Sequence, residues 1–232
     1  MADRLIFTLS PGRCGTKYLT YAMRLVPGVA AFHEPSPNFV SVVEEARRDP
    51  YVAVRFWLDK KLPWIDSLEQ PVYFESSHLF GKGFVSALVT IGRVPDVVVL
   101  TRPHREVALS FWRRRSIPGR TWSGISYLLD PTGLKNWDKL TDYQLCYWYC
   151  LEMNRRIRTS AVFIASKEGI VESIKMRQLV TEAGFSDLCH RLALPAPTGF
   201  LGSMIVNSSP LRWKVLYPEG NIDDLEAEVE CL

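Results

Sequence analysis

The residues with the clearest chemical potential lie in one segment near the start of the chain, Leu5 to Leu19 (LIFTLSPGRCGTKYL). An apolar run leads into two glycines accompanied by hydroxyl and cationic side chains, and a helix-like pattern follows. This arrangement is typical of a loop that holds a phosphate with backbone N–H groups at the N-terminus of a helix. The segment therefore predicts a ligand that carries phosphate.

The spacing within this loop differs from a Walker A motif. That motif needs a glycine, four residues, and then Gly-Lys followed by Ser or Thr. Here only Arg13 and Cys14 separate Gly12 from Gly15, and Lys17 is followed by a tyrosine. The difference favours a phosphate-bearing ligand other than a metal-bound nucleoside triphosphate.

A second cation and hydroxyl follow another apolar run. Arg102 comes at the end of a strand-like segment, and Ser110 falls about two turns into the helix-like segment after it. A guanidinium and a hydroxyl held on rigid elements can grip a terminal phosphate through charge-assisted hydrogen bonds. The alternative is an arginine paired with a nearby carboxylate and a serine that faces solvent.

The segments that position these residues alternate between strand-like and helix-like patterns. This alternation predicts an α/β fold of three layers, in which helices flank a central, mainly parallel sheet. The strand-like segments are residues 5–9, 29–32, 72–74, 96–100 and 161–165, and the helix-like segments are 16–25, 38–48, 83–91, 104–115 and 142–158. Residues 117–139 are rich in Gly, Pro, Trp and Tyr and predict a long surface excursion.

Polar side chains recur where the predicted strands end. Ligands of open α/β sheets bind outside the carboxyl ends of the strands, so we expect these side chains to converge on one crevice. The residues concerned are Arg13, His33, Glu34, Glu75, His78 and Arg102.

Length and charge suit one globular domain over residues 1–232. The net charge of +3 is too small to indicate nucleic acid as a partner. Six arginines between Arg102 and Arg120 form either a solvated face or a binding surface, and the six carboxylates of residues 219–230 predict a solvated tail.

The five cysteines show neither CxxC spacing nor a Cys/His cluster, so they predict no zinc site and are expected to be mostly buried free thiols. The first apolar segment is only as long as a strand, and no apolar run is long enough to span a bilayer. We therefore expect a cytoplasmic protein without a transmembrane segment. The sequence does not indicate an oligomeric state.

Taken together, the two phosphate motifs resemble those of sulfotransferases that use 3′-phosphoadenosine 5′-phosphosulfate (PAPS). The first family signature follows a strand and reads Pro-Lys/Arg-Ser-Gly-Thr-Thr/Ser and then an aromatic or aliphatic residue. Residues 13–18 are similar to it, with Cys14 in place of the serine and Lys17 in place of a threonine. The second signature is an arginine, a turn with proline, and Val-Ala-aliphatic-Ser before aromatic residues, as in 102–112. The resemblance covers about residues 4–115.

The resemblance implies a P-loop-like fold and transfer of a sulfuryl group from PAPS to a hydroxyl of a small-molecule, carbohydrate or lipid acceptor, with no metal required. Arg13 would stabilise the charge that develops on the leaving 5′-phosphate. The nucleotide-binding residues carried over are Arg13, Cys14, Gly15, Thr16, Lys17, Tyr18, Arg102 and Ser110, and Arg105 is expected to add affinity.

The acceptor must lose a proton, and three residues at strand ends are candidates for the general base. Glu34 matches the position of a glutamate that follows the second strand in many family members. His78, in Ser77-His78-Leu79, resembles the histidine context of the cytosolic branch. His33 is the third candidate, and its alternative role is a hydrogen bond to the backbone.

The chain departs from the family at its C-terminal part. The Arg-Lys-Gly segment that binds nucleotide in cytosolic members is missing, and Arg212-Trp213-Lys214 is a poor basic substitute. Aromatic residues in irregular segments either line an acceptor pocket or anchor loops; they are Phe56, Trp57, Trp64, Trp122, Tyr127 and Trp137. Two other functions remain open, a P-loop small-molecule kinase and a nucleotide-binding module without catalytic activity.

Overall fold

Five parallel strands form the centre of the molecule in the computed structural model, which describes residues 3–202 and 217–232. The sheet order is β2-β3-β1-β4-β5, so β1, which carries the phosphate loop, is the middle strand. The strands are β1 (Arg4–Leu9), β2 (Val29–His33), β3 (Val72–Ser76), β4 (Asp96–Thr101) and β5 (Val171–Lys175). Ile6, Phe7 and Leu9 of β1 are fully buried, as expected for a strand covered on both faces.

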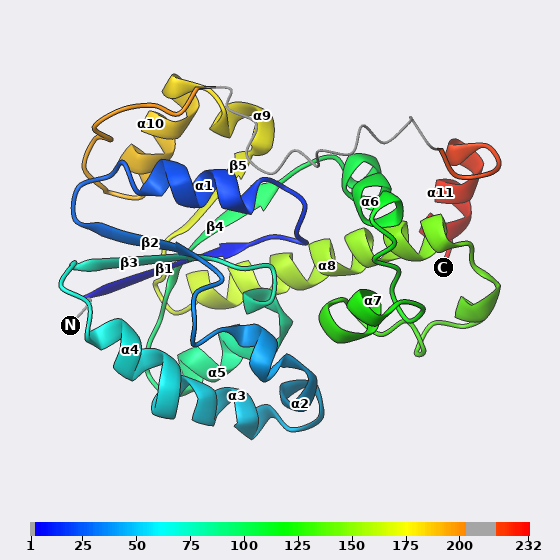
Figure 1. Cartoon of the computed structure of the whole chain (residues 1–232), viewed down its shortest axis with the longest axis horizontal. Helices are drawn as coiled ribbons and strands as arrows, with labels where there is room; N and C mark the ends of the chain where they lie inside the picture. Colours follow the sequence, from blue (N-terminus) through cyan, green and yellow to red (C-terminus); the bar gives the residue numbers. More distant parts are fainter. Residues whose placement is uncertain (1–2, 203–216) are drawn as a thin grey trace.

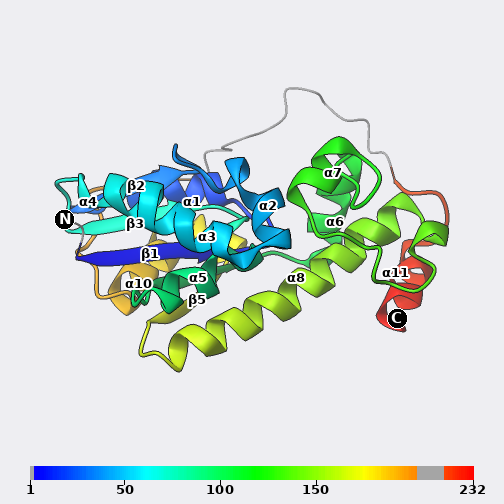
Figure 2. The ribbon, with the colours of Figure 1, turned by 90° about the horizontal axis from the view of Figure 1, so that it is seen from below.

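Helices cover both faces of this sheet and complete three layers (Figures 1 and 2). On one side lie α1 (Thr16–Met23) and α10 (Glu182–Arg191). On the other side lie α3 (Pro50–Phe56), α4 (Leu62–Asp66), α5 (Val85–Thr90) and the long α8 (Asp142–Ala165). The expected α/β class with a parallel central sheet is confirmed.

The N-terminal half of α8 extends beyond the sheet and carries a second group of helices (Figure 2). A capping box begins this helix, since the Thr141 hydroxyl accepts from Gln144 N–H and the Gln144 side chain accepts from Thr141 N–H. Packed around it are α6 (His104–Arg113), α7 (Trp122–Tyr127) and α11 (Ile222–Glu230). The other elements are α2 (Val43–Arg48), α9 (Met176–Leu179), the 3₁₀ turns Phe39–Ser41 and Trp137–Lys139, and the π turns Trp57–Lys61 and Phe80–Phe84.

The expected strand at 161–165 is wrong, because these residues are the last turns of α8. Ile157 and Ile164 are buried, whereas Val162 is 71% exposed. A short apolar run fits a strand and a helix equally well by composition, and here the helical spacing of seven residues decides. The fifth strand is β5, which pairs with β4 and lies ten residues later than expected.

Three other expectations change in detail. The helix expected at 38–48 is divided at Val42 into a 3₁₀ turn and α2. The helix expected at 83–91 is preceded by the π turn Phe80–Phe84. The excursion at 117–139 includes α7 and buries Ile117, Leu128 and Leu129, so it is a packed part of the molecule.

The acidic tail is docked through α11, which packs against α8, and of its six carboxylate residues only Glu226 is buried while the other five are exposed, as expected. The Glu226 carboxylate is buried and pairs with Arg105 at 2.7 Å, and it also accepts a hydrogen bond from the Tyr143 hydroxyl. Tyr147 donates to Glu230 at 2.7 Å. Burial of a carboxylate requires such partners. Arg105, which is expected to add nucleotide affinity, is thus paired with Asp223 and Glu226 of α11.

Most of the large aromatic side chains anchor the core. Phe7 stacks on Phe80 at 4.3 Å between ring centroids and meets Trp57 edge-on at 5.6 Å. Phe56 and Trp57 are buried, so they do not line an acceptor pocket. Lys61, also buried, pairs with Glu75 at 2.8 Å, which gives the polar end of β3 a structural role.

Candidate active site

The phosphate loop connects β1 to α1 and is shaped by backbone in the left-handed region. Gly12 and Gly15 both have φ of 91°, and Arg13 has φ of 59°. The φ of 91° is what favours glycine at position 15, and a Cβ there would also lie 2.2 Å from the sulfur of Met176, so that side chain would have to move. Leu19 N–H bonds to the Gly15 carbonyl, which leaves the N–H groups of the first turn of α1 free of helical partners, as an anion cradle requires.

Arg13 is held in place by the second motif. Its Nε donates to the Ser110 hydroxyl of α6 at 3.0 Å, and Arg102 Nη1 donates to the Arg13 carbonyl at 3.3 Å. Arg102 also pairs with Glu106 at 2.6 Å. The structure therefore brings together the two motifs that the sequence placed 97 residues apart.

Three cations are concentrated at this point. Burial, together with Arg114 and Arg102, lowers the pKa of Arg13 to about 10. Arg13 is therefore charged at neutral pH, although its charge is poorly compensated. A non-glycine residue with positive φ carries strain, and such strain concentrates at functional sites. A phosphate at the N-terminus of α1 would supply the missing negative charge.

The other predicted loop residues differ in what they can offer a ligand. Cys14 is fully buried, its thiol points to the Gly12 carbonyl at 3.3 Å, and burial raises its pKa to about 11. Its backbone N–H is the only group it can offer. Tyr18 is buried and donates to the Gly202 carbonyl at 2.7 Å. Thr16 and Lys17 are half-buried in the first turn of α1.

A cavity of about 660 Å³ opens at the carboxyl ends of β4 and β5, beside the loop. Its lining includes Arg102 and Pro103 from the second motif and Lys175, Met176 and Arg177 from α9 and the residue before it. Lys175, Met176 and Arg177 were not among the predicted site residues, because the strand that leads to them was expected at 161–165, ten residues too early. Arg212-Trp213-Lys214, the possible basic substitute, lies outside the described residues.

Glu34 follows β2 and also has a left-handed backbone, with φ of 49°. Its N–H donates to the Ser76 carbonyl at 3.3 Å, and its carboxylate accepts from the Ser77 hydroxyl at 3.3 Å. These bonds attach it to the end of β3. His33 is fixed beside it, because its Nδ1 lies 3.1 Å from the Ser76 carbonyl and 2.9 Å from the Ser76 hydroxyl. The backbone contact considered for His33 is therefore present.

His78 lies between the loop and Glu34. A Cβ on Gly12 would lie 3.3 Å from the Cβ of His78, and His78 Nε2 is 3.9 Å from Glu34 Oε1. Lys82 Nζ is 3.1 Å from His78 Nδ1. With Lys82 as the donor, Nδ1 is the acceptor, and the neutral ring carries its proton on Nε2, the atom that faces Glu34. In this arrangement the Nε2–H group of His78 faces Glu34 at 3.9 Å, which is too far for a hydrogen bond.

The burial of His78 predicts a pH dependence of stability. Burial, together with Lys82 and His33, lowers the pKa of His78 well below its ordinary 6.5. Below about pH 6.5 this histidine is protonated in the unfolded chain but stays neutral in the folded one. The free energy of unfolding therefore falls as the pH falls. We expect the melting temperature of the wild type to drop more steeply between about pH 7 and about pH 5.5 than that of His78→Gln.

His33 keeps part of this dependence in the variant, because burial lowers its pKa as well. Differential scanning calorimetry of both proteins across this range measures the difference. Equal slopes for the two proteins would show that His78 is not the group responsible.

The comparisons with known proteins agree with this architecture. A sulfotransferase domain from the curacin biosynthetic pathway has a similar structure, with a TM-score of 0.56 and 13% sequence identity over 84% of this chain and 75% of that chain. The sequence matches no family model and no curated protein. The structural likeness shows that this chain has a sulfotransferase-like fold, as its two motifs indicated.

Proposed function

We propose that this protein is an enzyme that transfers a sulfuryl group from PAPS to a hydroxyl of an acceptor. One observation carries the proposal: Arg13, at the head of α1, is bonded to Ser110 and Arg102, the residues of the second motif. Both motifs thus meet at one point, as binding of one nucleotide with two phosphate positions requires. The sulfotransferase-like fold supports the same reading.

The donor would bind across the loop and the cavity beside β4 and β5. Backbone N–H groups of Gly15 and Thr16 would hold the 5′-phosphate at the N-terminus of α1. Arg102 and Ser110 would hold the 3′-phosphate, with Lys175 and Arg177 adding positive charge on the other wall of the cavity. Fixed cations would neutralise the phosphates without a metal.

In the reaction, a bond forms between the acceptor oxygen and sulfur while the bond between sulfur and the 5′-phosphate oxygen breaks. The proton of the acceptor hydroxyl passes to the general base, and the electron pair of the broken bond remains on the phosphate. Arg13 would stabilise this developing charge, and Lys17 would assist from the same turn. The products are the sulfated acceptor and 3′,5′-adenosine bisphosphate.

Glu34 is the general base that the geometry favours. Its carboxylate is held by Ser77 and faces His78, which borders the loop at Gly12. A carboxylate accepts a proton directly, whereas His78 presents a proton-bearing nitrogen on this side when Lys82 donates to its other nitrogen. His78 would then orient Glu34 rather than take the proton itself.

Ligand binding tests the proposal against its two rivals. We expect 3′,5′-adenosine bisphosphate to raise the melting temperature more than ADP or ATP with Mg²⁺, because only the bisphosphate fills both phosphate positions. Stabilisation by ATP with Mg²⁺ alone would favour the kinase, although β4 ends at Thr101 and is followed by Arg102 rather than by an aspartate. Binding of the bisphosphate without sulfate transfer to a broad acceptor panel would favour a non-catalytic module.

We also propose that the protein works in the cytoplasm. Cys14, Cys146, Cys150 and Cys189 are buried free thiols, which suits a reducing compartment such as the cytoplasm. No helix in the described part of the chain is both long and apolar enough to cross a membrane. Small-molecule, carbohydrate and lipid acceptors all fit the proposed chemistry.

A further inference from the structure

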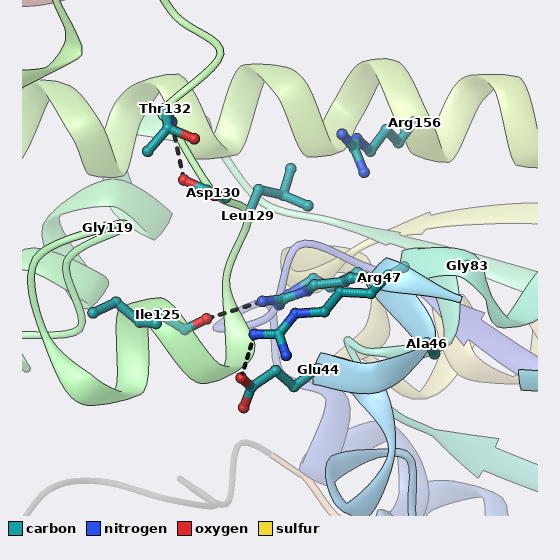
Figure 3. A pocket seen from close by; sticks show the side chains of 12 residues that line it. Glu44, Ala46, Arg47, Gly83, Gly119, Ile125, Leu129, Asp130, Thr132 and Arg156 are labelled. Carbon is teal, nitrogen blue, oxygen red and sulfur yellow. Dashed lines mark hydrogen bonds and ion pairs between the residues drawn. The ribbon is translucent and has the colours of Figure 1, made fainter. Parts of the chain in front are cut away.

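A cavity of about 760 Å³ lies on the other side of the candidate site from the nucleotide cavity, among α2, the segment around α7, and α8 (Figure 3). Its charged lining residues are Glu44, Arg47, Arg48, Lys82, Asp130 and Arg156. Four of these are basic and two are acidic, so the cavity is positive. Arg156 projects from α8 toward the space that Arg47 enters from α2 (Figure 3).

The four basic side chains differ in how their charges are compensated. Arg48 pairs with Glu44 at 3.0 Å, and Arg156 pairs with Glu152 at 2.7 Å. Arg47 instead donates to two backbone carbonyls, Ile125 at 2.9 Å and Leu128 at 2.6 Å. Within the described residues it forms no ion pair with a carboxylate. Arg47 therefore connects α2 to the α7 segment through backbone carbonyls, and Glu44 and Asp130 act on its charge only from a distance.

Lys82 is the second basic group without an ion pair among the described residues, and it connects the cavity to the candidate base. Its side chain is buried, donates to the Tyr127 carbonyl, lies 3.1 Å from His78 Nδ1 and stands 5.0 Å from the centre of the Tyr149 ring. No carboxylate in the described part of the chain forms an ion pair with it. His78 contacts Lys82 on one side and faces Glu34 on the other, so a ligand that reaches Lys82 lies close to the candidate base.

Two neighbouring cations that form no ion pair with a described carboxylate are costly to bury. Burial lowers the pKa of Arg47, although Asp130 and Glu44 act in the opposite direction. Burial followed by Arg47 lowers the pKa of Lys82, and the more distant Glu34 opposes this shift. An anion bound here would remove the repulsion and accept charge-assisted hydrogen bonds from both side chains. Arg47 and Lys82 are therefore arranged as in a binding site whose ligand supplies negative charge.

We propose that the acceptor is an anion, and that its carboxylate or phosphate group binds beside Arg47 and Lys82 while its hydroxyl faces Glu34. This inference rests on the proposed sulfuryl transfer, because it takes the cavity as the acceptor side of the same site. It narrows the acceptor from any hydroxyl compound to one that carries negative charge.

The test uses hydroxyl compounds that differ at one charged or neutral substituent, titrated into the full-length protein saturated with 3′,5′-adenosine bisphosphate, so that the phosphate loop is occupied. The sets are glucose, glucuronate and glucose 6-phosphate, and 4-hydroxybenzyl alcohol and 4-hydroxybenzoate. We expect the charged members to bind at least about tenfold more tightly than the neutral ones by calorimetry. The sugar set separates preference for carboxylate from preference for phosphate.

Variants assign the preference to this cavity. In Arg47→Gln the charged and neutral members are expected to bind within about threefold of each other, whereas Arg47→Lys keeps most of the preference because it keeps the charge. Arg55→Gln, an exposed arginine on α3, is the matched control and should behave as the wild type. Unchanged bisphosphate affinity in each variant shows that the protein is folded.

The outcomes separate this inference from the proposed function. If the bisphosphate binds and no charged compound binds more tightly than its neutral partner, including the case in which none binds, the anionic acceptor is refuted and sulfuryl transfer stands. If the bisphosphate does not bind to the wild type, sulfuryl transfer is refuted. The same titrations on the free protein, compared with Arg47→Gln, then still decide whether the cavity binds anions.

Discussion

Replacement of Arg13 by glutamine is expected to lower kcat for sulfuryl transfer by about 10²–10³-fold. The guanidinium is the one predicted cation that is fixed by Ser110 at 3.0 Å, so it is already oriented before charge develops on the leaving phosphate. Glutamine keeps much of the length and polarity and removes the charge. Steady-state kinetics with PAPS and an accepted hydroxyl compound measure the loss.

Two further variants separate charge from position in this first prediction. Arg13→Lys should recover part of the rate, and Ser110→Ala should lose less than Arg13→Gln, because it removes only the anchor of the side chain. The exposed Arg55 provides the control, Arg55→Gln. If kcat of Arg13→Gln stays within about threefold of the wild type at saturating PAPS, Arg13 does not stabilise the transition state.

The same arginine predicts the alkaline limit of the reaction. Since its pKa is lowered to about 10 by burial and then by Arg114 and Arg102, its charge is present at neutral pH and is lost above about 10. Arg114→Gln removes one of the repelling charges and should move this limit to higher pH. The pH profile of kcat/KM for PAPS records the shift in both proteins.

The second large effect is expected for Glu34→Gln, which should lower kcat by about 10²–10⁴-fold while affinity for the bisphosphate is unchanged. The amide preserves the shape and the contact with Ser77 but cannot accept the acceptor's proton. His78→Gln is expected to cost less, about tenfold, because His78 would orient Glu34 rather than act as the base. Turnover at saturating donor and acceptor measures both.

The pair of variants decides between the candidate bases. Loss of turnover in His78→Gln with retention in Glu34→Gln would make His78 the base. Retention of full turnover by both would leave neither of them in this role and would turn attention to His33, whose ring is fixed by Ser76. Glu34→Asp, which retains the carboxylate but shortens its reach, should give an intermediate rate.

Several features of the fold were readable because they depend on residues close together in the sequence. The glycine loop, its apolar strand and the helix after it form one continuous local pattern, and Arg102 and Ser110 form another. The carboxyl ends of parallel strands share one edge, so these motifs were expected to meet, and the bond from Arg13 to Ser110 shows that they do.

Other features depended on contacts that a local pattern does not contain. The run at 161–165 is apolar and short, and only its continuity with Asp142 onward makes it helical. Arg105 lies within the second motif, yet its guanidinium pairs with Glu226, which is 121 residues away in the sequence. The partner of Arg105 lies outside any window in which propensity or spacing is judged, whereas the end of α8 is decided by the longer helix to which it belongs.

By itself, the sequence determined the central elements of this protein: the phosphate loop, the arginine and serine that serve it, and the α/β class that places them. These follow from steric limits on glycine and from hydrogen bonds within a few residues. Only the tertiary structure decided which charges remain free. Arg105 is neutralised by α11, whereas Arg47 and Lys82 are left facing a cavity that residues from four distant parts of the chain enclose. Long-range packing assigns each charge its partner, and the proposed anionic acceptor rests on that assignment.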